Sequence, residues 1–206
     1  MKLDAKGLEN GVVRLEPFQL AHVAHLEAAG AVESMWAYMP DIPKGKSANT
    51  YAAHILSQYE SGLMVPFTMF RQSDDAFAGV VSYEMISKTH RRLRIANFWH
   101  PEEMRGSGVF QASQALLIQR ALDWGARRIG WAVAKDAAAA VRAVKRLGAK
   151  EEGVLRSYYR LAGGGWADVV VLSMLREEAE MALQRLEIAA DLAADAASGS
   201  STFNTP

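Results

Sequence analysis

Two glycines just before a helical segment are the clearest chemical feature of this sequence. The turn Arg105-Gly106-Ser107-Gly108 follows an apolar run that ends at Trp99 and precedes a helical pattern that reaches Asp123. Such a turn presents backbone N–H groups at a helix N-terminus, where they and the helix dipole favour a phosphate or diphosphate group. Glycine also lets the backbone approach a ligand without a Cβ atom in the way. Because ordinary turns use the same residues, the turn by itself leaves both interpretations open.

Aromatic residues gather before a loop that contains two prolines and a glycine. Trp36, Tyr38 and Met39 lie close together, and the loop at residues 40–45 follows them directly. Proline and glycine in this density end regular structure. The three side chains therefore either line the mouth of a pocket or pack two neighbouring helices together, and the sequence favours neither alternative.

The strands and helices around the glycine turn must position these residues. Alternating apolar residues predict seven strands, at residues 12–16, 64–70, 77–86, 92–99, 128–133, 152–161 and 167–175. Helical periodicity predicts helices at residues 19–29, 47–61, 109–123, 136–147 and 176–195. The three strands before the turn form an antiparallel meander. The strand, helix, strand order after it implies a right-handed crossover and a locally parallel pair.

Length and composition set further bounds. The 206 residues suit one domain, residues 1–175, followed by the helix at 176–195 and a disordered tail at 196–206. The net charge is zero, with 23 basic and 23 acidic residues, which argues against nucleic acid as a partner. The chain has no cysteine, and His22 and His25 lack an evident third ligand, so we predict no metal site.

The lengths of the apolar segments bear on cellular location, and an apolar helix stripe bears on assembly. Neither a signal peptide nor an apolar run long enough to cross a membrane is evident, so we expect a cytoplasmic protein with no membrane partner. The helix at 176–195 carries an apolar stripe that includes Ala179, Leu183 and Leu186. This stripe packs either on the domain or on a partner chain, as in a homodimer.

Four segments in a fixed order carry a family resemblance. They are Trp36-Ala37-Tyr38-Met39-Pro40, the loop from Arg105 to Phe110, Arg146-Leu147-Gly148-Ala149 with Glu151 to Arg156 behind it, and Asp168 five residues before Ser173. Their order and spacing resemble the GCN5-related N-acetyltransferase (GNAT) superfamily. The closer likeness is to its branch of ribosomal-protein N-terminal acetyltransferases and their small-molecule relatives. The likeness covers about residues 11–175.

The resemblance implies a fold, a co-substrate and a reaction. The fold is α/β (α+β), a mixed, mostly antiparallel seven-stranded sheet with a splayed central parallel pair and helices on both faces. Acetyl-CoA is bound by loop amides at its diphosphate and by strand backbone at its pantetheine. Carried over to this chain, the strand residues are Asn97, Phe98 and Trp99, and the loop residues are Arg105, Gly106, Ser107, Gly108, Val109 and Phe110. A deprotonated amine attacks the thioester carbonyl directly, and Trp36, Tyr38 and Met39 would bind the acceptor.

The sequence departs from the family pattern where proton transfer is expected. Arg94-Ile95-Ala96 stands where the family often has Glu-Ile-Gly. Ala137 and Ala140 occupy positions that are commonly Asn and Ser, and Leu172 replaces a frequent Tyr. Phe110 fills a loop position that is usually Gly or Ala. The resemblance therefore preserves the phosphate-binding backbone more completely than the catalytic side chains.

Two functions remain open from the sequence. Glu84, on the neighbouring strand, is either the general base or a solvated strand residue, and Tyr158 and Tyr159 either pack in their strand or reach the cleft. The first hypothesis is an acyl-CoA-dependent N-acetyltransferase acting on a primary amine of a small molecule or a peptide, such as a protein N-terminus. The second is a catalytically weak or inactive acyl-CoA-binding member that serves as a binding or regulatory module. Loss of acid–base help slows such a reaction by about 10²–10⁴-fold without abolishing it.

Overall fold

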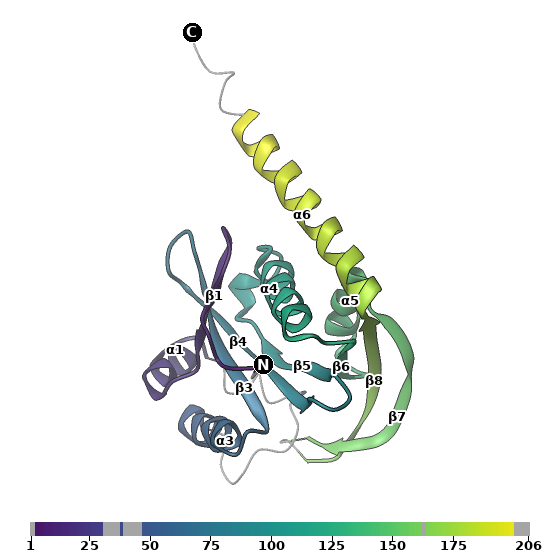
Figure 1. Ribbon diagram of the computed structural model, residues 1–206. Coiled ribbons are helices and arrows are strands. Elements are labelled where there is room, and N and C mark those ends of the chain that lie inside the picture. Colours follow the sequence, from purple (N-terminus) through teal and green to yellow (C-terminus); the bar gives the residue numbers. More distant parts are fainter. Residues whose placement is uncertain (1–2, 31–37, 39–46, 162–163, 200–206) are drawn as a thin grey trace.

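A single mixed sheet organises the protein (Figure 1). The computed structural model describes residues 3–30, 38, 47–161 and 164–199. Within these ranges the sheet has eight strands in the order β1-β2-β3-β4-β5-β6-β8-β7. The strands are β1 (Leu8–Glu9), β2 (Val13–Pro17), β3 (Met64–Arg71), β4 (Phe77–Ser87), β5 (Arg92–Trp99), β6 (Arg128–Ala134), β7 (Lys150–Arg160) and β8 (Trp166–Leu175). All seven predicted strands are present. The eighth, β1, is too short to show a period in the sequence.

Five helices accompany the sheet in the described ranges. They are α1 (Val23–Ala28), α3 (Ala48–Glu60), α4 (Val109–Trp124), α5 (Ala138–Leu147) and α6 (Arg176–Gly199), with short 3-10 turns η1 (Leu20–His22) and η2 (Glu102–Met104). Local sequence sets their ends. The Ser47 side chain accepts a hydrogen bond from the Thr50 N–H and so caps α3. Gly125 and Gly148, both with positive φ, end α4 and α5.

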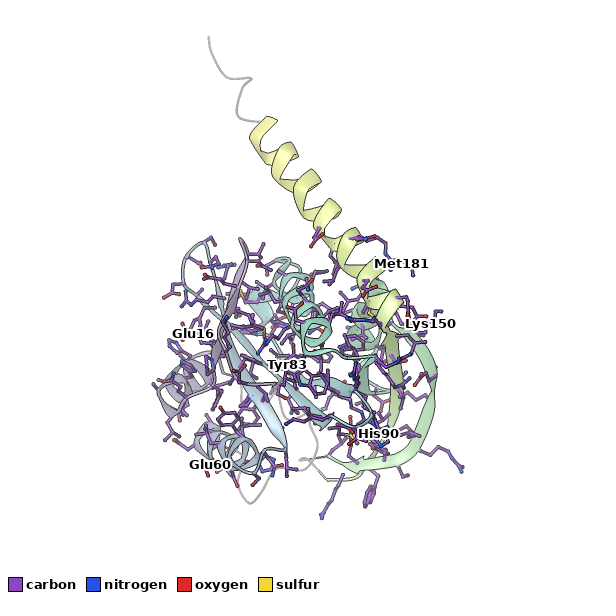
Figure 2. All side chains as sticks on the ribbon, viewed as in Figure 1. Glu16, Glu60, Tyr83, His90, Lys150 and Met181 are labelled. Carbon is purple, nitrogen blue, oxygen red and sulfur yellow. The ribbon has the colours of Figure 1, made fainter. Side chains whose placement is uncertain are left out.

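Helices cover both faces of the sheet, as the ribbon and the side chains packed beneath it show (Figures 1 and 2). The larger core lies beneath α4, α5 and the first turns of α6 and includes Val81, Tyr83 and Trp131. The smaller core lies beneath α1 and α3 and includes Val80. Val80 and Val81 belong to different cores because successive strand residues point to opposite faces. Two helical layers on a mostly antiparallel sheet confirm the predicted α/β fold.

The parallel pair β5–β6 is short and then splays. Its pairing covers Arg92 to Arg94 on β5 and Arg128 to Gly130 on β6. Beyond these residues β5 continues to pair with β4, and β6 continues to pair with β8 as far as Ala134. The sheet therefore opens between the C-terminal halves of β5 and β6, which confirms the predicted splay.

Two backbone features shape the end of β5. Asn97 has a φ of 52°, which is uncommon for a residue other than glycine, and the β4–β5 register shifts nearby, between Val80 and Ser82. Gly79 on β4 lies so close to β5 that a Cβ atom there would meet the Trp99 carbonyl oxygen at 1.9 Å. Glycine at position 79 therefore permits the close approach of the two strands.

The C-terminal helix leaves the domain after its first turns (Figure 1). Ala179, Ala182 and Leu183 are buried against the larger core, whereas Met181, labelled in Figure 2, is exposed. The helix continues to Gly199, beyond the boundary at 195 that the sequence predicts, and residues 200–206 of the predicted tail lie outside the described residues. None of the helices in the described part of the chain is both long and apolar enough to span a membrane.

Candidate functional site

The glycine turn leads directly into α4, and the N–H groups at the start of this helix have no side-chain cap. Gly106 and Gly108 have φ values of 78° and 83°, and Gly108 is the N-cap of α4. The first intrahelical bond runs from the Ala112 N–H to the Gly108 carbonyl, at 3.0 Å. The N–H groups of the first turn therefore have no intrahelical partner, and no side chain of the N-cap residue caps them. A Cβ atom at either glycine would meet open space. This backbone fits a diphosphate group.

Side chains of the turn support this backbone from behind. The Ser107 hydroxyl donates to the Met104 carbonyl at 2.7 Å, and Met104 and Val109 are buried in the core. The Phe110 ring packs against the rings of Phe98 and His100, with centroid separations of 5.7 and 6.0 Å. Phe110, where the family usually has a small residue, is thus directed back toward the end of β5. The turn is anchored on both sides while Gly106 and Gly108 stay exposed.

The last residues of β5 border the splay. Because β6 no longer pairs with β5 here, the main chain of Asn97, Phe98 and Trp99 is available along that edge. The Asn97 side-chain amide donates to the Ser82 hydroxyl at 2.9 Å, which fixes the bend of the strand. Phe98 packs with the larger core, and Trp99 packs with the smaller one. The predicted strand residues thus line the opening with backbone rather than with polar side chains.

Several buried side-chain nitrogen atoms at the end of β5, just after it and on α4 lack a hydrogen-bond partner in the described part of the chain. They are Trp99 Nε1, His100 Nε2 and Gln114 Nε2. His100 Nδ1 lies 2.8 Å from the Ala78 carbonyl, which assigns the ring proton to Nδ1. Burial lowers the His100 pKa to about 4, so the ring is neutral at pH 7 and Nε2 is an acceptor. Unpartnered buried polar atoms are rare in folded proteins.

A carboxylate and a guanidinium face each other beside the splay. Glu84 on β4 is directly opposite Arg94 on β5, and the Glu84 Oε1 and Arg94 Nη1 atoms are 3.8 Å apart. Their neighbours Tyr83 and Ile95 are buried in the larger core, so Glu84 and Arg94 lie on the other face of the sheet. Burial raises the pKa of Glu84 above its usual value, and the Arg94 charge opposes part of that rise. Arg94 also forms the last β5–β6 pair, which places both groups at the base of the opening.

Tyr159 reaches the same place from the β7–β8 hairpin. Its hydroxyl donates to the Ala132 carbonyl at 3.1 Å, on the part of β6 that no longer pairs with β5. Burial, then the negative charge of Glu84, raises the Tyr159 pKa to about 12, so the hydroxyl keeps its proton at neutral pH. Tyr158 is instead exposed. The two tyrosines that the sequence leaves undecided thus differ, and only Tyr159 contacts the splayed strand.

Other motif residues have structural partners. The Ser157 N–H donates to an Asp168 carboxylate oxygen at 3.0 Å and holds a bulge in β7 that carries Tyr159 over β6. The Ser173 hydroxyl donates to Glu152 at 2.8 Å, and Glu152 pairs with Arg128. These contacts explain the aspartate and serine of the last hairpin without a catalytic role.

In the structure, the three positions where the family commonly has polar side chains are occupied by apolar residues, namely Ala137, Ala140 and Leu172. Ala137 is the N-cap of α5 and forms no side-chain cap, and Ala140 packs against the larger core. Leu172 is fully buried opposite Trp131. None of the three can exchange a proton, which leaves Glu84 and Tyr159 as the candidates for proton transfer at the opening.

The predicted acceptor segment is described at one position. Tyr38 is exposed, with 48% of its surface accessible. Trp36 and Met39 lie outside the described residues, so their predicted part in binding the acceptor stays a prediction.

Comparison with known proteins agrees with this geometry. A family model described as Acetyltransferase (GNAT) domain matches residues 13–150. A structure from T. thermophilus, assigned as an acetyltransferase, has a TM-score of 0.80 and 27% identity, covering 89% of this chain and 96% of that one. The sequence has no significant match among curated proteins.

Two further solved structures share the fold at lower identity. Mycobacterium smegmatis RimJ, in complex with CoA-disulfide, has a TM-score of 0.75 and 19% identity and covers 90% of this chain and 93% of that one. A Salmonella typhimurium acetyltransferase that modifies the N-terminal serine of a 50S ribosomal subunit protein has a TM-score of 0.68 and 20% identity. That match covers 81% of this chain and 96% of the Salmonella chain.

Proposed function

This chain belongs to the GNAT acetyltransferase family, and from that membership we propose that it transfers an acetyl group from acetyl-CoA to a primary amine. The observation that carries the proposal is the start of α4, where the helix has no side-chain cap and the space around the N-cap residue Gly108 is open, beside a splayed strand. That combination provides donors for a diphosphate and, next to them, a free strand edge for an extended amide-bearing chain.

The co-substrate would lie along the opening of the sheet. The N–H groups of Gly108, Val109 and Phe110 would donate to its diphosphate, and the main chain of Asn97 to Trp99 would pair with its pantetheine amides. Bound in this way, acetyl-CoA supplies an activated thioester carbonyl. The chain itself provides orientation, because the loop is anchored by the buried Met104 and Val109 side chains.

Glu84 would receive the proton of the attacking amine, directly or through a water molecule. Burial raises its pKa and so makes the carboxylate a stronger base than an exposed glutamate, while the Arg94 charge favours the ionised form. Tyr159, whose pKa is raised to about 12, would keep its proton and its hydrogen bond to the Ala132 carbonyl and so hold the opposite side of the splay. General acid–base help of this kind is worth about 10²–10⁴-fold in rate.

As the acceptor we propose a primary amine on a peptide N-terminus or on a small molecule. The Salmonella relative modifies the N-terminal serine of a ribosomal protein, which supports a peptide, although its identity to this chain is only 20%. The exposed Tyr38 side chain precedes α3 and would contact the acceptor.

A second candidate function is acyl-CoA binding without efficient catalysis. It is favoured by the apolar side chains at Ala137, Ala140 and Leu172, none of which can move a proton. The two functions share the binding step and differ in whether Glu84 acts.

Calorimetric titration with acetyl-CoA, followed by a thiol-release assay, separates these functions. The amine panel should hold short peptides with free N-termini, polyamines, amino sugars and amino acids. We expect saturable binding and thiol release with at least one class, reduced in Glu84→Gln. Binding without thiol release across the panel would support the binding module. Absence of binding at millimolar acetyl-CoA would contradict both functions.

A further inference from the structure

A second concave site lies at the other end of α4 from the glycine turn. It is a cavity of about 400 Å³, and its lining includes Arg91, Arg127, Arg128, Arg176 and Glu177. Gly125, which ends α4, also lines it. Because α4 has 16 residues that each rise 1.5 Å, the cavity is about 24 Å from Gly108. It is therefore separate from the proposed acetyl-CoA site.

Main-chain hydrogen bonds bring three of the arginines together. The Arg127 N–H donates to the Arg91 carbonyl at 2.7 Å, and the Arg176 N–H donates to the Arg127 carbonyl at 3.1 Å. The β4–β5 hairpin, the start of β6 and the start of α6 thus meet at one point. Since the backbone makes this junction, the side chains of Arg91 and Arg127 are not needed to hold it.

The four arginine side chains of the cavity differ in whether they have hydrogen-bond or ion-pair partners. Arg128 is paired with the Glu152 carboxylate. Arg176 donates to the Leu122 carbonyl at 3.3 Å and lies 3.5 Å from Glu180. By contrast, the exposed Arg91 and Arg127 guanidinium groups have no hydrogen-bond or ion-pair partner among the residues that the structure describes.

The remaining charges of the cavity are unbalanced. Glu177 is the one carboxylate among the described lining residues, and it stands against two unpaired guanidinium groups. The α6 N-terminus, at Arg176, adds a partial positive charge. A single carboxylate satisfies one arginine here, as Glu152 does for Arg128. Two free arginines in one cavity therefore suit a ligand with at least two negative charges.

We propose that this cavity binds a small, multiply charged phosphate compound, for which inorganic diphosphate is the simplest probe. Guanidinium groups bind phosphate oxygens through paired N–H donors, which makes arginine the usual choice for phosphate. A volume of about 400 Å³ falls within the range of small-molecule sites. Arg91 and Arg127 would contact the ligand directly, and the engaged Arg128 and Arg176 would contribute mainly positive potential.

The test must separate this cavity from the diphosphate-binding turn at the other end of α4. Calorimetric titration with inorganic diphosphate is therefore done at low salt in the Gly108→Val background, where the turn is blocked. We expect one equivalent to bind. Arg91→Ala and Arg127→Ala should each weaken binding by about 10–100-fold, the loss of one charged hydrogen-bonding group. The matched control is Arg156→Ala, an exposed arginine on β7 outside the cavity, which should leave the affinity unchanged.

Two results would overturn the proposal. One is no heat of binding at millimolar diphosphate in the Gly108→Val protein. The other is equal affinity in the Arg91→Ala/Arg127→Ala double variant. The acetyl-CoA affinity of that double variant, measured with Gly108 intact, should equal that of the unmodified protein. If the unmodified protein did not bind acetyl-CoA, the proposed function would be wrong. The diphosphate titration does not use acetyl-CoA, so its result would still decide whether the cavity binds diphosphate.

Discussion

Replacement of Gly108 by valine tests whether the start of α4 binds the diphosphate of acetyl-CoA. Gly108 has a φ of 83°, and an added Cβ atom would enter open space at the N-terminus of the helix. Valine there places two methyl groups in front of the free N–H donors. Each charge-assisted hydrogen bond that is lost costs about 1.5–3 kcal/mol. Loss of one bond therefore weakens acetyl-CoA binding by at least about tenfold, and loss of two by about a hundredfold or more.

The same substitution also strains the backbone, and this effect needs a matched control. A residue other than glycine in the left-handed region costs about 1–2 kcal/mol. Gly62, after α3, has a φ of 70° and likewise open space around a Cβ atom, but it lies in the α3–β3 connection away from the turn. Gly62→Val and Gly108→Val should therefore lower Tm by similar amounts, about 2–8 °C in a chain of this length.

Calorimetric titration with acetyl-CoA and a thermal unfolding curve for each variant complete the comparison. We expect Gly62→Val to bind acetyl-CoA like the unmodified protein and Gly108→Val to lose at least about tenfold in affinity. Unchanged affinity in Gly108→Val would show that the diphosphate is not bound at this turn. Equal losses in both variants would assign the effect to reduced stability.

Three other substitutions test the rest of the site. Glu84→Gln should lower the acetylation rate at neutral pH by about 10²–10⁴-fold and leave the acetyl-CoA affinity unchanged. If its rate and pH profile equal those of the unmodified enzyme, Glu84 takes no part in the mechanism. Arg94→Gln removes the charge that lowers the Glu84 pKa, so the acidic limb of the pH–rate profile should move to higher pH, and a shift to lower pH would contradict this coupling. Gly79→Ala puts a Cβ atom 1.9 Å from the Trp99 carbonyl oxygen and should reduce the free energy of unfolding by about 3 kcal/mol, measured by denaturant titration. The control is Gly11→Ala, where the added Cβ atom meets open space and the free energy of unfolding should not change.

The sequence predicts the elements of the fold well because their periods are local. Alternation identifies all of the longer strands, and helical periodicity places α3, α4 and α5 to within two residues at each end. The turn at Gly106 and Gly108 is also where the sequence places it. By contrast, the bend of β5 depends on a positive φ at Asn97, and one asparagine inside a strand pattern is too weak a signal to predict it, although asparagine adopts this conformation more often than most residues.

Side-chain partners in the site depend on strand register, which the sequence does not state. Glu84 and Arg94 are opposite each other only because of the register shifts in the β4–β5 pair. Tyr159 reaches β6 only because β7 bulges at Ser157. The sequence gives even less indication that Gln114 is buried. A glutamine in the second turn of a helix is usually exposed, but this one is fully buried and accepts a hydrogen bond from Trp131.

The pairing of Glu84 with Arg94 gives a physical reason for one departure of this chain from the family pattern. Arg94 stands on β5 where the family often has a glutamate, which by itself would remove the carboxylate from the site. Because Glu84 is the cross-strand neighbour of Arg94, a carboxylate is still present at the same level of the opening, one strand away. Burial makes that carboxylate more basic, and the adjacent guanidinium favours its ionised form. We therefore propose that the proton acceptor is displaced by one strand rather than lost.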